Sequence, residues 1–377
     1  MSQNKTTLLF FLLLLLKSGF SFGQMPLSKE AKISVLTCGK GNELYSVYGH
    51  TALRIKDDKN SLDIIYNYGV FDFKTENFYL KFIKGDLKYF VAAYNYNEFY
   101  YEYSAEKRSI FEQELHLSQT QKQQLFNNLN ATLFSDKKYY TYKFIDRNCT
   151  SKVMDEINKV AREKCIVKTI NLDKTYREVL FQYLENQFYE NLGINIIFGE
   201  KVDNPCEKLF LPIELMESLK TARLENKLLS GEPRLILKGD ESKSPLSLWN
   251  NFYTYSAIFI LIAISRKKWI YLSVFSIFGL FGLFLSLVGF YSYHQEVSYN
   301  YNTLLLNPLF LLLLYFYWKK KYKWLHYICI TNLILLGIYT VFLVNKPNLL
   351  LFTPMILTSA IVLIYFYNWS RNKIKRA

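Results

Sequence analysis

The sequence predicts an exported α+β domain followed by an all-α membrane domain of about five transmembrane helices. Charged residues are concentrated in the first two thirds of the chain, whereas the sequence beyond Trp249 consists of Leu, Ile and Phe runs broken by basic clusters. The polar first part and the apolar second part offset each other, so the mean hydropathy of the whole chain is +0.00. We therefore expect a signal peptide or N-terminal anchor at 1–23, an exported domain at 24–245 and a transmembrane domain at 246–377.

The N-terminus has the order of regions that is typical of a secretory signal. Lys5 precedes an apolar run over residues 8–16, and the small residues Ser21 and Gly23 follow. Because Lys17 interrupts the apolar run, cleavage and retention as an anchor both stay open. In either case the residues that follow are exported.

Alternating apolar and polar residues predict a small antiparallel sheet in the exported domain. The predicted strands cover 31–38, 51–56, 62–68 and 87–94. An amphipathic helix is predicted over 117–133, behind the cap residue Ser118. A second helix is predicted over 149–162, where Asp146 and Asn148 are available to cap the first turn.

Five apolar segments near the C-terminus predict membrane spans, several of them close to the ~20 residues that a bilayer requires. They are 251–264, 269–291, 303–318, 324–344 and 349–369. Basic clusters at 266–268, 319–321 and 371–376 fall on alternate connections, which the positive-inside rule assigns to the cytoplasm. Five spans with a cytoplasmic C-terminus return the exported domain to the outer face. The net charge of +14 comes partly from these cytoplasmic clusters and partly from a basic exported domain that can lie against anionic lipid head groups. Nucleic acid is not an expected partner of an exported, membrane-tethered domain.

His50 and Cys149 are the candidate base and nucleophile of a thiol enzyme. His50 lies in SVYGHTALRI, where it opens a predicted strand, and Cys149 lies in FIDRNCTSKV, where it opens a predicted helix. The unpaired N–H groups and the positive dipole end of a helix start stabilise a thiolate. The same N–H groups face the position where an oxyanion would form, so the pair is suited to attack on an acyl carbonyl.

A third group should orient the His50 ring through its other nitrogen. Asn67 and Tyr66, on the next predicted strand in IIYNYGVFD, are the candidates for this role, and Asp72 lies behind them.

Further candidates surround the pair. Tyr48, Arg54 and Asn148 are candidates for binding or polarising the substrate. Cys38 is an alternative nucleophile because it closely precedes His50, although it lacks a helix start and a flexible Gly-Lys-Gly turn follows it.

The remaining candidates lie further along the chain. His294, Asn302 and Asn307 flank the second and third spans on the expected outer face, where they are candidates for contact with a lipid head group or an acceptor. Cys165 and Cys206 are a possible disulfide pair, and two unpaired thiols are an equal alternative. No metal-ligand spacing and no Gly-rich phosphate loop is found, so no cofactor is expected.

The segments TCGKGNELYSVYGHTALRI, IIYNYGVFDF and DRNCT resemble the N-terminal periplasmic domain of the Lnb family, which are lipoprotein N-acyltransferases with a multi-span C-terminal half. The order of a histidine before Asn-Cys is also similar to permuted papain-like folds of the NlpC type. The local resemblance covers roughly residues 33–155, and Lys40 stands where the family leads us to expect proline.

This resemblance implies a permuted papain-like exported domain in the periplasm, tethered to the bacterial inner (cytoplasmic) membrane. It also implies acyl transfer from a membrane phospholipid, through a thioester on Cys149, to the free α-amino group of a lipoprotein's lipidated cysteine. The implied partners are the phospholipid donor, the lipoprotein acceptor and the bilayer.

Two other classes of function use the same features. An exported cysteine hydrolase, acting on peptides or lipids, would use His50 and Cys149 with water in place of an amine. A membrane-anchored binding or assembly module would keep the fold without catalysis. The five predicted spans argue against a hydrolase of the cell-wall lattice, because such an enzyme needs only a tether.

Overall fold

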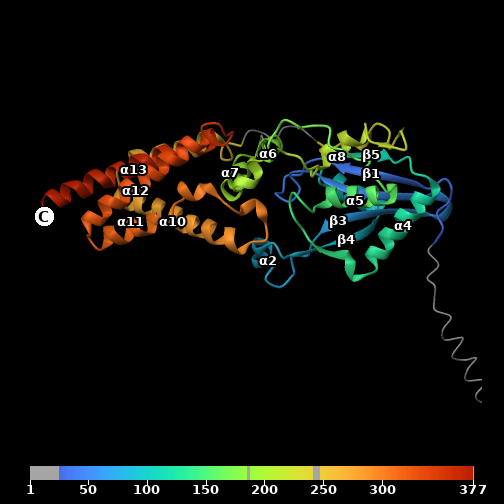
Figure 1. The fold of residues 1–377 in the computed structure, drawn as a ribbon, viewed down its shortest axis with the longest axis horizontal. Helices are drawn as coiled ribbons and strands as arrows, with labels where there is room; N and C mark the ends of the chain where they lie inside the picture. The colour runs from blue at the N-terminus through green and yellow to red at the C-terminus, as the bar shows by residue number, and fades with distance from the viewer. Residues whose placement is uncertain (1–24, 185–186, 241–246, 377) are drawn as a thin grey trace, which may run out of the picture.

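The computed structural model describes residues 25–184, 187–240 and 247–376. The signal peptide or anchor predicted at 1–23 lies outside the described residues. The molecule is elongated, with a sheet domain at one end and a bundle of long helices at the other (Figure 1). The predicted fold class, an α+β domain followed by an all-α membrane domain, is confirmed.

Seven strands form the main sheet, in the order β6-β4-β3-β2-β1-β5-β9. They are β1 (Lys32–Cys38), β2 (His50–Asp57), β3 (Leu62–Val70), β4 (Lys88–Asn95), β5 (Ile110–Glu114), β6 (Tyr139–Thr141) and β9 (Arg234–Leu237). A separate hairpin pairs β7 (Arg223–Leu224) with β8 (Lys227–Leu228). The four predicted strands correspond to β1 to β4. The sheet also contains β5, β6 and β9, which were not predicted. These strands are short, and a short strand shows little alternation of apolar and polar residues in the sequence.

Helices cover both faces of this sheet. The helices of this domain are α2 (Phe78–Lys84), α3 (Tyr96–Ala105), α4 (Gln119–Leu133), α5 (Cys149–Ala161), α6 (Tyr176–Phe181), α7 (Phe188–Ile197) and α8 (Pro212–Leu219). On one face Val153 and Ile157 of α5 pack in a core that contains Leu53 of β2. On the other face Phe99 of α3 packs in a second core that contains Ala52 of β2. Because successive residues of a strand point to opposite faces, β2 is buried on both sides.

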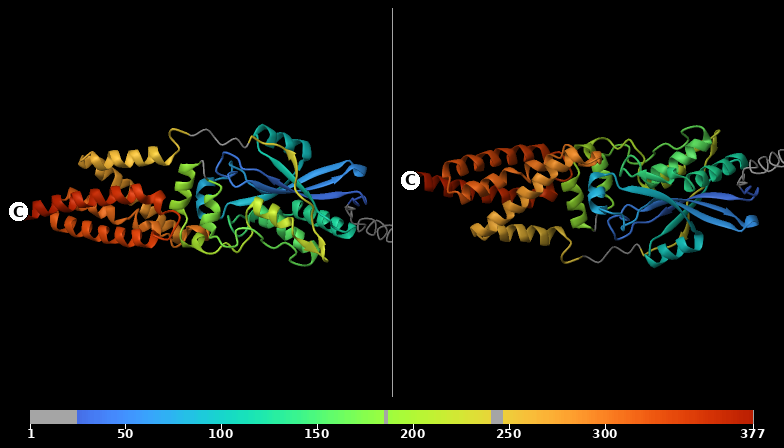
Figure 2. Two further views of the ribbon diagram at one scale, coloured as in Figure 1. Left: turned by 90° about the horizontal axis from the view of Figure 1, so that it is seen from above. Right: turned by 90° about the horizontal axis from the view of Figure 1, so that it is seen from below.

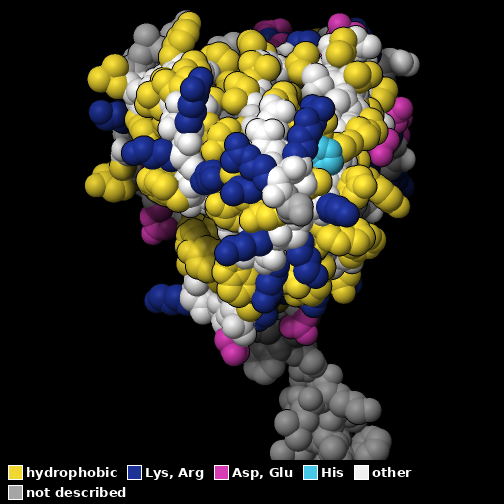
Figure 3. Space-filling view, turned by 90° about the vertical axis from the view of Figure 1, so that its left-hand side faces the viewer, with side chains coloured by type: hydrophobic (Ala, Val, Ile, Leu, Met, Phe, Trp, Pro, Cys, Tyr) yellow, Lys and Arg dark blue, Asp and Glu magenta, His cyan; other side chains and the backbone are white. Residues whose placement is uncertain are grey.

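The bundle consists of α9 (Phe252–Ile264), α10 (Lys268–Tyr291), α11 (Leu309–Trp318), α12 (Tyr322–Leu343) and α13 (Leu349–Lys375). Five spans were expected. In the described part of the chain four segments are long and apolar enough to cross a membrane: Lys268–Tyr291, Gln295–Trp318, Tyr322–Leu343 and Leu349–Lys375. The fifth, α9, is apolar but shorter, with 13 residues. Lysine and arginine side chains are prominent on the end of the bundle that points away from the sheet domain (Figure 3).

Polar contacts hold the two domains together through α6, α7 and the short 3-10 helices η3 (Glu200–Asp203), η4 (Gln295–Val297) and η5 (Tyr301–Leu304). Arg177 of α6 pairs with Asp203, and Lys346 at the end of the α12–α13 connection pairs with the same carboxylate at 2.8 Å. Asn302 of η5 is fully buried and donates to the Asn195 carbonyl at 2.7 Å. Since each of these groups would be costly to bury without its partner, the sheet domain is held in one position on the bundle.

One end of the sheet faces the bundle. β1 ends there at Cys38, β2 begins there at His50, and β3 and β4 meet there through the connection that carries α2. The loop after α10 hydrogen-bonds to this connection, because the Tyr293 N–H donates to the Lys84 carbonyl at 2.7 Å. Both α2 and α7 lie between the sheet and the bundle (Figure 2).

Candidate active site

His50 and Asn67 meet at the sheet end that faces the bundle. Asn67 lies opposite Ala52 in the β2–β3 pair, and Ala52 is two residues from His50, so the two side chains share one face of the sheet. His50 Nε2 is hydrogen-bonded to Asn67 Oδ1. Because an amide oxygen can only accept, Nε2 carries the proton in this bond, and Nδ1 is the ring nitrogen available to a second partner.

Cys149 is brought to this histidine by the start of α5. Asn148 is the N-cap: its Oδ1 accepts from the Ser151 N–H at 2.9 Å, and its Nδ2 donates to the Phe144 and Phe210 carbonyls at 2.7 Å each. This network fixes the first turn, so Cys149 occupies the first helical position. Its sulfur lies near enough to the His50 imidazole for that ring to lower the pKa of the thiol.

A pair of threonines joins the two elements directly beside the sulfur and the ring. Thr51 Oγ1 lies 3.0 Å from Thr150 Oγ1, and both residues are fully buried. Thr51 follows His50 and Thr150 follows Cys149 in the chain, so this bond sets the separation of strand β2 from the start of α5.

Two glycines with positive φ allow this close approach. Gly49 has φ +82°, and a Cβ there would lie 2.6 Å from the Cys38 carbonyl oxygen. Gly69 has φ +92° in the irregular stretch between Asn67 and Val70, and a Cβ there would lie 3.7 Å from the Cys149 Cβ. Since other residues rarely adopt such φ values, glycine is required at 49 by conformation and by space.

The surroundings of Cys149 favour a thiolate. Burial raises the pKa of its thiol, but the charge of the His50 imidazole and hydrogen bonds from His50, Thr51 and Thr150 outweigh it, so the net pKa is lowered. For His50, burial lowers the pKa, but the charge of Cys149 and the interactions with Cys149 and Asn67 raise it by more, so the net pKa is raised. The two shifts have opposite signs, as expected for a thiolate–imidazolium pair.

Cys38 lies in a different environment although it is the cross-strand neighbour of His50. Its side chain is 0% exposed, compared with 8% for Cys149. Burial is the main cause that raises the pKa of the Cys38 thiol, to about 12. The geometry therefore favours Cys149 over Cys38 as the nucleophile.

Comparison with known families agrees with this description. Residues 24–182 match the Lnb N-terminal periplasmic domain, and residues 239–376 match the Lnb transmembrane domain. The chain belongs to the Lnb family. No curated protein and no solved structure matches it.

Membership of the Lnb family makes this a membrane-anchored, lipoprotein-processing protein whose sheet domain is periplasmic. The first match lies in the sheet domain, and the second covers the helical bundle.

The other candidates for orienting the His50 ring lie elsewhere in this Lnb protein. The Tyr66 hydroxyl donates to Asn130 Oδ1 of α4 at 2.7 Å, on the opposite face of the sheet from Asn67. Asp72 lies in the turn after β3, where its carboxylate accepts from the Lys74 N–H.

The flanking substrate-binding candidates have structural partners. Tyr48 is buried, with its ring 5.3 Å from the ring of Phe144. Arg54 forms ion pairs with Asp63 at 2.7 Å and Glu112 at 3.1 Å, so its guanidinium is engaged within the sheet domain. Asn148 uses its side chain to cap α5, as described above.

The candidates in the bundle also have partners. His294 Nε2 contacts the Phe82 carbonyl of α2 at 3.0 Å, and Asn307 Oδ1 accepts from the Leu309 N–H at the start of α11. Asn302 joins the two domains through the Asn195 carbonyl. His294 and Asn302 thus connect the bundle to the sheet domain.

All five cysteines are free. The Cys165 sulfur donates to Asn158 Oδ1 at 3.3 Å, whereas the Cys206 sulfur lies 2.7 Å from Lys168 Nζ. The alternative of two unpaired thiols, rather than a disulfide between Cys165 and Cys206, is the one that the structure contains.

The sequence analysis missed the positioning residues of the site. Thr51 and Thr150 each directly follow a candidate catalytic residue, in HT and CT, and this repeated order was the available signal. Gly49 carried a signal as well, since a glycine immediately before a strand often marks an unusual backbone conformation. The contact of α2 with the bundle had no local signal.

Proposed function

We propose that this protein is a transacylase that moves an acyl chain from a phospholipid, through a thioester on Cys149, to the α-amino group of the lipidated N-terminal cysteine of lipoproteins. The observation that most directly supports this proposal is the grouping of Cys149, His50 and Asn67 at the sheet end that faces the bundle. There the His50 ring is hydrogen-bonded to Asn67 and lowers the pKa of the Cys149 thiol. A thiolate in that position can reach lipid substrates at the membrane surface. In this proposal the membrane is the bacterial cytoplasmic membrane and the C-terminus is cytoplasmic, which the basic end of the bundle supports (Figure 3).

In the first half-reaction the Cys149 thiolate attacks the carbonyl carbon of a phospholipid ester. The negative charge that develops on the carbonyl oxygen is stabilised by the first N–H groups of α5, which have no acceptor within the helix. Collapse of the tetrahedral intermediate breaks the bond to the glycerol oxygen. His50 gives its proton to that oxygen, so a lysophospholipid leaves and an acyl thioester stays on Cys149.

In the second half-reaction the acceptor amine attacks the thioester carbonyl. His50 takes the proton that the amine loses, and the carbon–sulfur bond breaks to restore the thiolate. Asn67 acts as a positioning residue because it holds the ring with Nδ1 toward the sulfur in both steps. Since Cys149 is only 8% exposed, access of water to the thioester is restricted, which favours transfer to an amine over hydrolysis.

The test uses the full chain in lipid nanodiscs that contain a phospholipid of known acyl composition. We expect intact-mass spectrometry to show one added acyl group that hydroxylamine removes, as a thioester requires. Cys149→Ala should abolish the adduct, and the matched control Cys165→Ala should keep it. Loss of the adduct in Cys38→Ala with retention in Cys149→Ala would instead make Cys38 the nucleophile.

The acceptor is tested by adding a diacylated lipopeptide with a free N-terminal amine. The proposal predicts an amide on that amine and loss of the thioester. Release of free fatty acid at the same rate with and without the lipopeptide would identify a hydrolase instead. Failure of the wild-type protein to acquire any acyl group would contradict enzymatic function by this route.

A further inference from the structure

The connection between β3 and β4 presents an apolar surface beside the bundle. Within α2, Tyr79 is 73% exposed, Leu80 is 63% exposed and Phe82 is 47% exposed. Phe73, in the loop before the helix, is 63% exposed. Large apolar side chains gathered on one short segment are typical of a surface that contacts a partner or a membrane.

The bundle places this surface at the level of the lipid head groups. Hydrogen bonds join α2 to the loop that follows α10: Ser292 Oγ donates to the Ile83 carbonyl at 2.7 Å, and His294 Nε2 contacts the Phe82 carbonyl at 3.0 Å. Because α10 is a membrane-spanning helix that ends at Tyr291, residues bonded to its following loop lie where the hydrocarbon region ends. The exposed side chains of α2 are therefore next to the leaflet on the side of the sheet domain.

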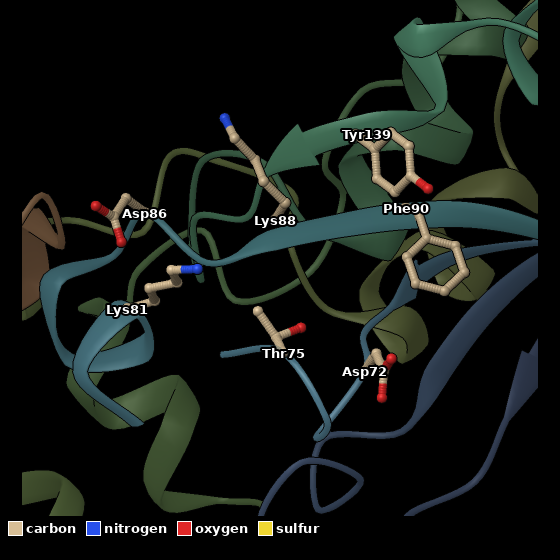
Figure 4. Close-up of a pocket in the computed structure, with 7 residues that line it drawn as sticks. All are labelled: Asp72, Thr75, Lys81, Asp86, Lys88, Phe90 and Tyr139. Carbon is tan, nitrogen blue, oxygen red and sulfur yellow. The ribbon is translucent and has the colours of Figure 1, made fainter. Parts of the chain in front are cut away.

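A pocket of about 640 Å³ lies between the connection that carries α2 and strands β4 and β6 (Figure 4). Its wall combines Lys81 of α2 and Lys88 of β4 with Asp72, Thr75 and the ring of Phe90. Lys88 Nζ donates to a threonine hydroxyl, and no carboxylate in the described part of the chain pairs with Lys81. Lysine ammonium groups bind phosphate, and a carboxylate such as Asp72 suits a head-group ammonium, so the pocket suits a phospholipid head group.

A series of aromatic rings runs from α2 to the nucleophile. Phe78 of α2 is 5.8 Å from Phe71, Phe71 is 5.2 Å from Tyr89, and Tyr89 stacks on Tyr142 at 4.5 Å between ring centroids. Tyr142 lies near Cys149, because a Cβ placed on Gly69 would lie 3.8 Å from the Tyr142 ring and 3.7 Å from the Cys149 Cβ. The rings make a continuous apolar wall between the membrane surface and the sulfur.

We propose that residues 71–90, with α2 at their centre, form the surface through which the periplasmic domain takes a phospholipid from the adjoining leaflet. The exposed face of α2 enters the head-group region, the adjoining pocket receives the polar head group, and the acyl ester reaches Cys149 along the aromatic wall. This inference rests on the proposed function for the identity of the lipid as acyl donor. The contact of α2 with the leaflet is independent of it.

The first experiment measures the depth of α2 in a bilayer. Tyr79→Cys is made in a Cys149→Ser background, labelled with bimane and reconstituted in nanodiscs whose lipids carry a nitroxide at the head group. Tyr101→Cys on α3 is the matched control, because Tyr101 is 75% exposed and α3 covers the sheet rather than the end that faces the bundle. We expect severalfold stronger quenching at 79 than at 101. Equal quenching at the two positions would overturn the proposal, whether or not the protein is an acyltransferase.

The second experiment separates uptake of lipid from chemistry. In a chain with native Cys149, thioester formation is compared for a bilayer phospholipid and for a short-chain soluble ester. We expect Leu80→Asp to lower the ratio of the first rate to the second by about tenfold, because a charge on this face opposes insertion. Lys81→Glu should lower the same ratio through loss of the phosphate contact, with Lys137→Glu as its control. An unchanged ratio in both Leu80→Asp and Lys81→Glu would overturn the proposal, and wild-type inactivity toward both esters would instead contradict the proposed function.

Discussion

Replacing His50 by glutamine should raise the pKa of the Cys149 thiol. Glutamine keeps a polar side chain of similar length but cannot carry the charge of an imidazolium. A hydrogen bond to a charged group contributes ~1.5–3 kcal/mol. At ~1.36 kcal/mol for each pKa unit, its loss corresponds to a rise of about 1–2 units. Burial of Cys149, which raises the pKa, is retained, so we expect the thiol of the variant to titrate above its ordinary value of 9.0.

The sign of the effect can be measured directly. A lowered thiol pKa leaves thiolate present at lower pH, so wild-type Cys149 should react with iodoacetamide below pH 9.0 and lose this reactivity only as the pH falls through the lowered pKa. Alkylation is followed for the peptide that contains Cys149, using the full chain in nanodiscs. The His50→Gln profile should shift to higher pH by the amount given above.

His116→Gln is the matched control, because the exposed His116 ring is hydrogen-bonded to the Leu228 carbonyl, and the substitution should leave the profile unchanged. Identical alkylation profiles in wild type and His50→Gln would refute the thiolate–imidazolium pair. Faster alkylation of Cys38 than of Cys149 in the wild type would refute the assignment of the nucleophile, since the pKa of Cys38 is raised to about 12.

Three further substitutions test how the site and the domains are held. Gly49→Ala should lower the thermal unfolding midpoint and the rate of thioester formation, because the strained φ costs ~1–3 kcal/mol and the Cβ meets the Cys38 carbonyl; an unchanged midpoint would contradict the strain. Thr150→Val should cost ~1–3 kcal/mol by leaving the Thr51 hydroxyl unpaired, and thioester formation should slow more than in a surface control such as Lys137→Ala. Asn302→Leu removes the donor to the Asn195 carbonyl and the acceptor of the Tyr339 hydroxyl, and it should make the domain junction sensitive to limited proteolysis, a result that wild-type-like digestion would exclude.

Local signals were sufficient for the elements that carry the site. The start of α5 was predicted from Asn148 beside an apolar stripe, and capping depends on contacts within one turn. The strand that begins at His50 was predicted from alternation alone. These elements depend on neighbours a few residues apart, so the linear order of residues contains the necessary information.

The roles of individual polar side chains were less accessible from sequence. Arg54 follows His50 closely and was a candidate for substrate contact, yet it pairs with Asp63 and Glu112, which come from two other strands. Asn302 was expected at the outer surface of the membrane, yet it is buried between the domains. Both outcomes depend on strand register and on domain docking, which involve residues far apart in the chain.

The sequence by itself determined the order of an exported sheet domain and an apolar helical bundle, and the presence of one histidine and one cysteine at the starts of their elements. These features follow from local periodicity, capping and hydropathy. Only the tertiary structure decided that Asn67 is bonded to the His50 ring, that the Thr51–Thr150 bond joins the strand of His50 to the helix of Cys149, and that α2 is bonded to the loop that follows α10. The physical reason is that each of these contacts joins segments whose separation is set by the pairing of strands and the seating of one domain on the other, and no short stretch of sequence specifies either.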